Sequence, residues 1–294
     1  MEYVDRFIKK YESDSEVKNR KKVLSFFTTQ SNGKSLTMIT NALLRTSKTE
    51  KITFTLLQMV SPQEAEFIDS IDEYKNMLFK DLTSICEKEN TIARSFVKIS
   101  DDYASDILKL SEEHQSELII IEISSDDLDF TINENLYLSP KNETQKYPLS
   151  NVANPWIKNV SELLLRNDYA TALFIDKGIK SIKKVFVFIL DIRDISILRF
   201  AHHFPLNENT TLMIWDAIGL ISNIPELQKL FSSMNKKTDS RVEMWDIDKK
   251  ITEEVIQQQD LIITGIEGWD KLMHTSISWN KSLPTTLIIK DELN

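Results

Sequence analysis

The sequence contains a single cysteine, no long apolar run and no excess of basic residues. One cysteine, Cys86, excludes an internal disulfide framework and cysteine-rich metal sites, and we expect it to be a helix packing residue rather than a nucleophile. No stretch approaches the roughly 18–20 consecutive apolar residues of a membrane helix, and the N-terminus lacks the apolar core of a secretory signal. We therefore expect the chain as given to be soluble and cytoplasmic.

Acidic residues outnumber basic ones, 45 to 36, which gives a formal net charge of −9. This is the wrong sign for a protein that binds phosphate backbones, so nucleic acid is not an expected partner. His202 and His203 would point about 100° apart on a helix, and no metal site is expected from them. No serine sits in a nucleophile elbow and no acid and base can be paired by spacing, so we expect no catalytic residues and no enzyme activity.

What the sequence does contain is a regular alternation of apolar strands and amphipathic helices. Its 294 residues are about twice the usual domain length, so two domains are expected. Helix-length segments between the strands imply parallel pairing through right-handed crossovers, and thus an α/β fold. The expected strands are 23–27, 52–57, 94–99, 118–123 and 170–175 in the first half, and 185–190, 211–215, 241–247, 261–264 and 285–289 in the second.

The helices expected between these strands differ in length, and one segment breaks the alternation. Residues 124–155 contain two prolines and many polar side chains, so we interpret them as an insertion. Asp126, Asp127 and Asp129 within it are expected to form a solvated acidic loop. The expected helices are 34–44, 61–89, 102–115, 155–165, 195–204, 225–234, 251–258 and 268–281.

The domain boundary is expected near Gly178, between two buried strands. The first domain would then span residues 22–177 and the second 178–294, and an internal duplication explains five strands in each half more simply than one ten-stranded sheet. Residues 1–21 form an N-terminal arm whose apolar residues share one helical face. This arm either packs on the first domain or connects the chain to a preceding segment. The shared face consists of Val4, Phe7, Ile8 and Tyr11.

Three features of the second half resemble the universal stress protein (UspA-like) family: an opening strand that ends in Asp191, the strand LIITGIEG, and the closing segment SISWNKSLPTTLII. The first half has a similar closing helix and strand in VSELLLRNDYATALFI. The resemblance implies two tandem flavodoxin-like domains, each a five-stranded, mostly parallel sheet with helices on both faces. It also places a nucleotide pocket above the carboxyl ends of the strands.

The join between the strand ending in Ile175 and the next strand KVFVFILD is similar to the cytosolic C-terminal region of bacterial monovalent cation:proton antiporters of the Na⁺/H⁺ or Kef-like type. This resemblance implies a non-catalytic regulatory domain at the inner face of the cell membrane, with a transmembrane antiporter domain as its partner and a homodimer as a candidate assembly. The alternative is a free-standing tandem universal stress protein that binds a nucleotide with little or no hydrolysis. A scaffold with vestigial pockets is a third reading.

The resemblance to the stress proteins also implies a pocket for ATP or another adenine nucleotide, although the family's nucleotide-binding motif is incomplete in this sequence. Asp191 matches the acidic residue near the adenosine, and the pair Gly265 and Gly268 matches the phosphate-binding glycines. A later glycine is replaced by serines, Glu267 adds a negative charge, and Ile192 and Arg193 follow Asp191 in place of small residues. The resulting pocket residues are Asp191, Gly265, Gly268, Ser276 and Ser278.

Two further expectations concern the first half and the contact between the halves. The segment 31–35 lacks the first glycine of a P-loop, so we interpret it as a strand-to-helix turn capped by Ser31 or Asn32. The last strand of each half would be an exposed apolar edge, and antiparallel pairing of the two edges would cover both. We therefore predict an intramolecular pseudo-dimer with Ala172, Phe174, Leu287 and Ile289 at its interface.

Overall fold

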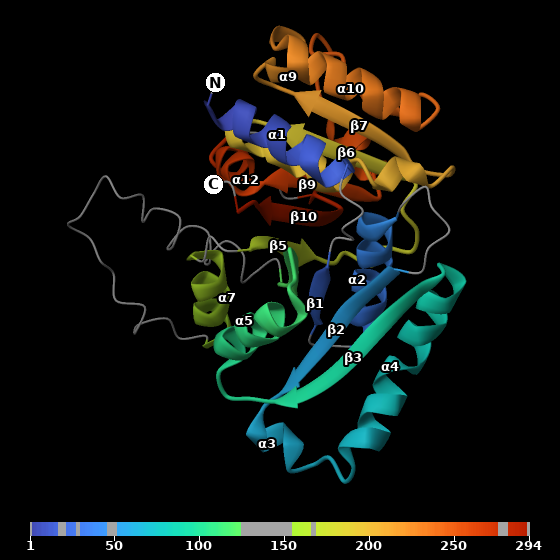
Figure 1. Ribbon diagram of the computed structural model, residues 1–294, viewed down its shortest axis with the longest axis vertical. Helices are drawn as coiled ribbons and strands as arrows, with labels where there is room; N and C mark the ends of the chain where they lie inside the picture. Colours follow the sequence, from blue (N-terminus) through green and yellow to red (C-terminus); the bar gives the residue numbers. More distant parts are fainter. Residues whose placement is uncertain are drawn as a thin grey trace, which may run out of the picture.

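The computed structural model describes residues 2–16, 22–27, 30–45, 52–124, 155–165, 169–275 and 282–292 (Figure 1). Strands alternate with helices in these ranges, except that no helix lies between the strands Ala170–Ile175 and Lys184–Ile189. The strands are β1 (Val23–Phe27), β2 (Ile52–Val60), β3 (Thr91–Ile99), β4 (Leu118–Glu122), β5 (Ala170–Ile175), β6 (Lys184–Ile189), β7 (Thr211–Asp216), β8 (Val242–Met244), β9 (Leu261–Gly265) and β10 (Thr285–Lys290).

The helices lie between these strands, with one more, α1, before them. Most of the expected insertion, including the three aspartates at 126, 127 and 129, lies outside the described residues. The α-helices are α1 (Glu2–Glu16), α2 (Gln30–Leu44), α3 (Pro62–Ala65), α4 (Ile71–Lys88), α5 (Tyr103–His114), α7 (Pro155–Leu165), α8 (Leu198–Ala201), α9 (Leu220–Asn223), α10 (Pro225–Lys237), α11 (Glu253–Gln257) and α12 (Ile266–Met273), and the 3₁₀ helices are η2 (Ile192–Ile197) and η3 (Phe204–Leu206).

The strands form a ten-stranded sheet in the order β3-β2-β1-β4-β5-β10-β9-β6-β7-β8. From either outer edge inward, the order is the third, second, first, fourth and fifth strand of that half. Neighbouring strands are parallel within each half. The sequence favoured two duplicated halves over one ten-stranded sheet. The structure has one ten-stranded sheet, because the two halves join edge to edge.

The seam of the sheet is the antiparallel pair β5 and β10, as expected for the last strands of the two halves. Leu287 lies opposite Phe174, and Ile289 lies opposite Ala172. All four side chains are buried. Each strand thus covers the edge that the other would leave open.

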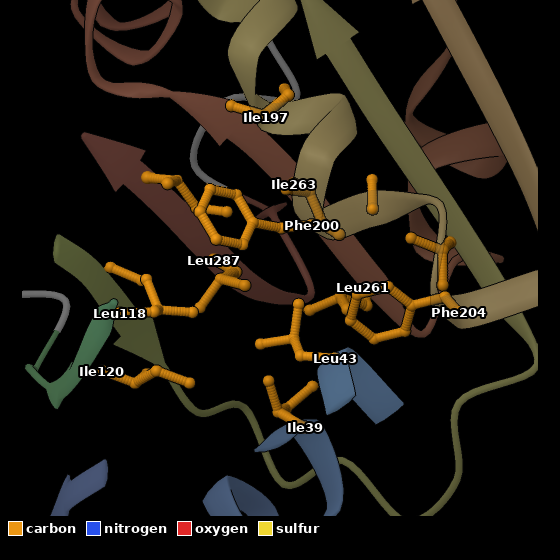
Figure 2. Packing of buried hydrophobic residues seen from close by; sticks show 14 of the residues in the cluster. Ile39, Leu43, Leu118, Ile120, Ile197, Phe200, Phe204, Leu261, Ile263 and Leu287 are labelled. Carbon is orange, nitrogen blue, oxygen red and sulfur yellow. The ribbon is translucent and has the colours of Figure 1, made fainter. Parts of the chain in front are cut away.

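A hydrophobic core lies on each face of the sheet, and both cores continue across the seam. Figure 2 shows part of one core, in which Ile39 and Leu43 of α2 lie close to side chains of the second half such as Leu261 and Phe204. The helices α1, α2, α4, η2, α8 and α10 contribute to this face, and α5, α7, α11 and α12 contribute to the other. Burial therefore does not stop at the expected domain boundary.

The N-terminal helix α1 packs on the second half, so the expectation that it packs on the first domain is wrong. Figure 1 shows α1 beside the strands β6 and β9, and it contacts η2. Val4 and Phe7 are buried, and the ring centroids of Tyr11 and His202 lie 5.1 Å apart. Lys10 forms an ion pair with Glu292, just beyond β10, so the two ends of the described chain meet.

The long helix expected over 61–89 is broken into α3 and α4, because two N-terminal caps fall within it. Ser61 and Glu64 form a capping box on α3, and the Ser70 hydroxyl accepts a hydrogen bond from the Glu73 amide at the start of α4. Cys86, on the inner face of α4, is buried as expected of a packing residue, and burial raises the pKa of its thiol.

Candidate functional site

The candidate pocket of the second half lies where the carboxyl ends of β6 and β9 meet. Asp191 follows β6 and caps η2, and its side chain accepts a hydrogen bond from the Arg193 amide at 3.1 Å. Asp194 completes a capping box with Asp191, because its carboxylate accepts a hydrogen bond from the Asp191 amide at 2.7 Å. This reciprocal pair starts the helical segment at Ile192, three residues before the helix expected at 195–204, and its first six residues form the 3₁₀ helix η2.

Asp194 is fully buried, and three backbone amides surround its carboxylate. Oδ2 accepts hydrogen bonds from the amides of Leu190 at 2.8 Å and Asp191 at 2.7 Å, and Oδ1 accepts one from the amide of Gly268 at 3.1 Å. Burial raises the pKa of Asp194 to about 7, against the lowering effect of the three amide donors. The side chain thus joins the turn after β6 to the helix after β9.

The same carboxylate explains the two glycines. A Cβ atom added to Gly265 or Gly268 would overlap the Asp194 side chain, with its oxygens as the nearest atoms. In the nucleotide-binding pattern these glycines let a phosphate approach the backbone. Here the chain's own anion occupies the space above both glycines and uses the Gly268 amide.

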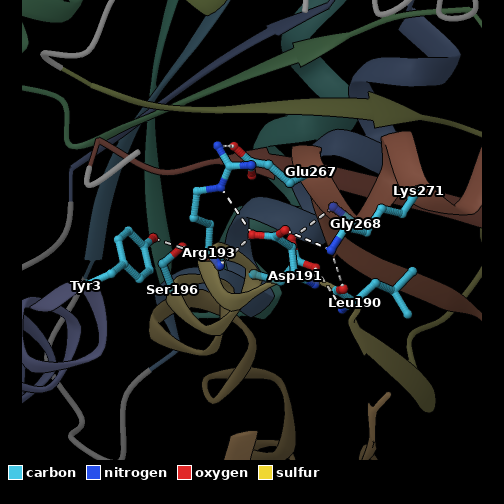
Figure 3. A network of polar contacts seen from close by, with 9 residues as sticks. Tyr3, Leu190, Asp191, Arg193, Ser196, Glu267, Gly268 and Lys271 are labelled. Carbon is cyan, nitrogen blue, oxygen red and sulfur yellow. Dashed lines mark hydrogen bonds and ion pairs between the residues drawn. The ribbon is translucent and has the colours of Figure 1, made fainter. Parts of the chain in front are cut away.

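Charged side chains form a chain of ion pairs over this turn (Figure 3). Lys271 Nζ lies 2.8 Å from Asp191 Oδ2 and donates to the Leu190 carbonyl oxygen at 2.9 Å. Arg193 bridges Asp191, at 3.1 Å, and Glu267, at 3.0 Å. The two residues that depart from the nucleotide motif, Arg193 and Glu267, are thus partners of each other.

Helix α1 is attached to the same turn. The Tyr3 hydroxyl donates to the Arg193 carbonyl oxygen at 3.1 Å, and the Ser196 hydroxyl donates to that oxygen at 2.9 Å (Figure 3). Burial raises the pKa of the Tyr3 phenol above its ordinary value, so the phenol is the protonated donor in this contact. The N-terminal helix is therefore bound directly to the residues of the candidate pocket.

A buried ion pair lies beneath this contact. Arg199 and Asp291 are almost fully buried, and one guanidinium nitrogen lies 2.8 Å and 3.0 Å from the two carboxylate oxygens. The same nitrogen lies 3.3 Å from Glu292, which also pairs with Lys10 of α1. Ion pairs thus link helix α1, helix α8 and the residues that follow β10.

The structure brings together three of the five predicted pocket residues. Asp191, Gly265 and Gly268 meet at one end of the sheet as the resemblance implied, whereas Ser276 and Ser278 lie outside the described residues. Asp194 and Lys271 were not predicted from the sequence. The spacing Asp191-x-x-Asp194 is that of a capping box, and this signal could have placed Asp194 in the turn.

The equivalent end of the first half is closed by a different pair. Asn32 donates a hydrogen bond to Glu122. Glu122 occupies the position in β4 that Gly265 occupies in β9. Helix α2 already begins at Gln30, so the expectation that Ser31 or Asn32 is its N-cap is wrong. Gly33 is needed for packing, because an added Cβ would come within 3.1 Å of both Phe27 and Leu82.

The two adjacent histidines do not diverge as a helix would require. Helix α8 ends at Ala201, and the rings of His202 and His203 stack with centroids 3.9 Å apart and planes 36° apart. His203 Nδ1 lies 2.8 Å from the carbonyl oxygen of Arg45, just after α2, so this pair contacts the first half. Among the described residues, no group of three or more His, Cys, Asp or Glu side chains is arranged to hold a metal ion.

Comparisons with known proteins show a likeness of fold. No protein-family model and no curated protein sequence matches the chain. Within the described ranges, no helix combines the length and apolar composition needed to cross a membrane. The chain is similar in structure to the cytoplasmic domain of a prokaryotic cation chloride cotransporter, with a TM-score of 0.52, 9% sequence identity, and coverage of 94% of this chain and 97% of that one.

Proposed function

We propose that this chain is a non-catalytic cytosolic regulatory domain of a bacterial ion transporter. The observation that carries the proposal is the structural likeness to a transporter's cytoplasmic domain over 94% of this chain and 97% of the other. A likeness confined to one half would be expected of many α/β proteins, since such folds host unrelated functions. The likeness covers both halves, so it extends to the way in which the two half-sheets are joined.

We also propose that the halves, 22–177 and 178–294, are tandem UspA-like domains arranged as an intramolecular pseudo-dimer. The mirrored strand order and the antiparallel seam support this reading. The resemblance in sequence favours a cation:proton antiporter as the transporter. In this proposal the transmembrane partner belongs to the same polypeptide or complex, and the domain lies at the inner face of the cell membrane.

Helix α1 is the element that would connect the domain to its transmembrane partner. Tyr3 and Lys10 bind α1 to the turn after β6 and to the end of β10. A conformational change in the turn after β6 or at the end of β10 would therefore alter the position of α1. A regulatory signal requires a ligand or interface that favours one such arrangement over another.

The alternative, a free-standing nucleotide-binding stress protein, is less well supported. Asp194 fills the space above Gly265 and Gly268, and its carboxyl group already uses the Gly268 amide that a phosphate would need. Glu267 adds a second acidic side chain to the same helix N-terminus. Nucleotide binding in this pocket would require the Asp194 carboxylate to move away from three amide donors.

The experiment that tests the proposal is to detect the endogenous protein with an antibody raised against this 34.1 kDa chain. A regulatory domain within a transporter polypeptide predicts a larger band in the membrane fraction, and one within a complex predicts co-purification with an integral membrane protein. Deletion of the domain should alter ion flux in membrane vesicles. A free 34.1 kDa protein in the soluble fraction, with unchanged flux after deletion, would contradict the proposal.

A further inference from the structure

A cavity of about 320 Å³ lies in the first half, at the amino ends of β1, β2 and β3 beside the C-terminal end of α5. It lies in a different half of the sheet from Asp191 and Asp194, which follow β6 in the second half. Because β5 and β10 are antiparallel, the amino ends of the first-half strands lie on the same side of the sheet as the carboxyl ends of the second-half strands. The lining residues come from all four elements and from the turns beside them. Those whose side chains bear on the ligand are Lys22, Thr53, Thr55, Arg94, Glu113 and Ser116.

The two halves differ at this position. Val23 and Val185 each pair with the first residue of the fourth strand of their half, so Thr55 of β2 corresponds to Met213 of β7. In the second half Phe186 packs against Trp245, with ring centroids 5.6 Å apart. Large apolar side chains thus gather where the first half has a cavity with hydroxyl groups.

The charge at this position also differs between the halves. Arg94 lies opposite Thr55 in the sheet, and Glu243 lies opposite Met213. The side chain of Arg94 makes no hydrogen bond or ion pair with any residue that the structure describes. Its five N–H groups are therefore available to a bound anion.

The inner wall of the cavity has unused hydrogen-bonding capacity. The Ser116 hydroxyl is buried and finds no hydrogen-bond partner among the described residues. Buried polar groups in folded proteins are nearly always hydrogen-bonded, so an unsatisfied one at a cavity indicates a missing partner. Lys22 Nζ donates to Gln115 Oε1 at 2.7 Å, which leaves two of its three protons for another acceptor.

The acidic groups of the site restrict the ligand. Glu113 and the C-terminal end of α5 favour hydrogen-bond donors and oppose a ligand that is negative throughout. Lys22 and Arg94 favour an anionic group, and Thr53 and Thr55 can bind polar substituents. The lining therefore suits a molecule with one anionic end and hydroxyl groups elsewhere.

We propose that this cavity binds a small hydroxylated organic anion, whose phosphate or carboxylate group contacts Arg94 and Lys22 and whose hydroxyl groups contact Ser116 and Glu113. The proposal does not depend on the transporter role, since it follows from the lining residues alone. Because all its lining residues belong to the first half, the site is separate from the nucleotide-type pocket of the second half.

The test is titration calorimetry of the whole chain with four probes at constant ionic strength: glycerol 3-phosphate, malate, inorganic phosphate and glycerol. We expect glycerol 3-phosphate or malate to bind with a sub-millimolar dissociation constant, and to bind more tightly than either phosphate or glycerol. The comparison of glycerol 3-phosphate with malate distinguishes a phosphorylated ligand from a carboxylated one. Absence of binding by both hydroxylated anions at millimolar concentration would overturn the proposal.

Variants test whether binding occurs in this cavity. Arg94→Gln should weaken binding about tenfold or more, since it removes a charge-assisted hydrogen bond. Ser116→Ala should also weaken binding while leaving the unliganded fold intact, because its hydroxyl has no partner there. Lys109→Gln is the matched control, an exposed cation on α5 outside the lining. Equal affinities in Arg94→Gln and Lys109→Gln would place the binding elsewhere and refute the assignment.

Discussion

Asp194 gives the two glycines beside it a structural explanation that requires no ligand. A glycine pair at a helix start is a common signal for phosphate binding, because the backbone must come close to the anion. In this chain the close approach is made by a carboxylate of the protein itself. The requirement for glycine can thus persist without a nucleotide.

The first prediction is that Gly265→Ala destabilises the protein through Asp194. The added Cβ would overlap the carboxylate, and overpacking of this kind costs about 1–3 kcal/mol in the free energy of unfolding. In an Asp194→Ala background, urea denaturation should show most of that cost removed. Gly178→Ala is the control: its cost comes from a φ of +82° in open space and should be the same in both backgrounds. Equal costs of Gly265→Ala in the two backgrounds would contradict this explanation.

The second prediction concerns pH. Burial raises the pKa of Asp194 from 3.8 to about 7, so the folded state holds this proton more tightly than the unfolded state. Stability from this group is therefore full below about pH 4 and is lost as the pH rises toward 7. Asp194→Asn cannot titrate, and its free energy of unfolding should fall less steeply over this range, by up to about 1.4 kcal/mol per pH unit. Parallel pH profiles for the two proteins would show that the carboxylate stays ionised in the fold.

The sequence predicted part of this site. The resemblance to the stress proteins implied that Asp191, Gly265 and Gly268 lie together, and the structure brings them together around Asp194. Their role in ligand binding stays a prediction. The ion pair of Arg193 with Glu267 was not predicted, since each was noted only as a departure from a motif. Contacts such as Tyr3 with Arg193 join residues far apart in the chain, and no local pattern encodes them.

At the scale of elements, α1 is an integral part of the second half's core. The third prediction is that Phe7→Ala lowers the free energy of unfolding by about 3 kcal/mol, because Phe7 is completely buried. Lys9→Ala, on the exposed face of α1, should have little effect. Hydrogen exchange should show that Phe7→Ala weakens protection in η2 and α8 more than in α2. Greater loss of protection in the first half would contradict the observed packing.

The fourth prediction separates buried from exposed ion pairs. Asp291→Asn leaves the Arg199 charge buried with a weaker partner and should cost about 3 kcal/mol or more in unfolding free energy. Asp239→Asn removes the partner of Arg241, but the Asp239 side chain is 86% exposed and its loss should be close to neutral. Urea denaturation of both variants measures the difference. Similar costs for the two would show that the Arg199 pair is not held in a low-dielectric environment.

Strands were easier to predict than helices. Almost continuously apolar runs such as 23–27 and 170–175 matched β1 and β5 residue for residue, because both faces of these central strands are buried. The helix expected over 61–89 was wrong because apolar spacing was followed past the caps at Ser61 and Ser70. The partner of α1 could not be predicted, since an amphipathic face specifies burial but not the surface that buries it.

At the scale of the whole molecule, the seam makes the two halves interdependent. The fifth prediction is that Leu287→Ala, which truncates a fully buried side chain of β10, costs about 3 kcal/mol and lowers the stability of both halves together. Unfolding should remain a single transition, with global hydrogen-exchange protection reduced equally in β1 and β6. Two separate transitions, or a loss of protection confined to the second half, would show that the halves fold as independent domains.

The position of α1 also sets an order of events during synthesis. Its docking surface on η2 and α8 lies about 180 residues further along the chain, so this first helix leaves the ribosome long before its partner exists. Strand β5 must wait in the same way for β10. The chain thus carries an undocked helix until η2 and α8 have been made, and an open sheet edge at β5 until β10 has been made.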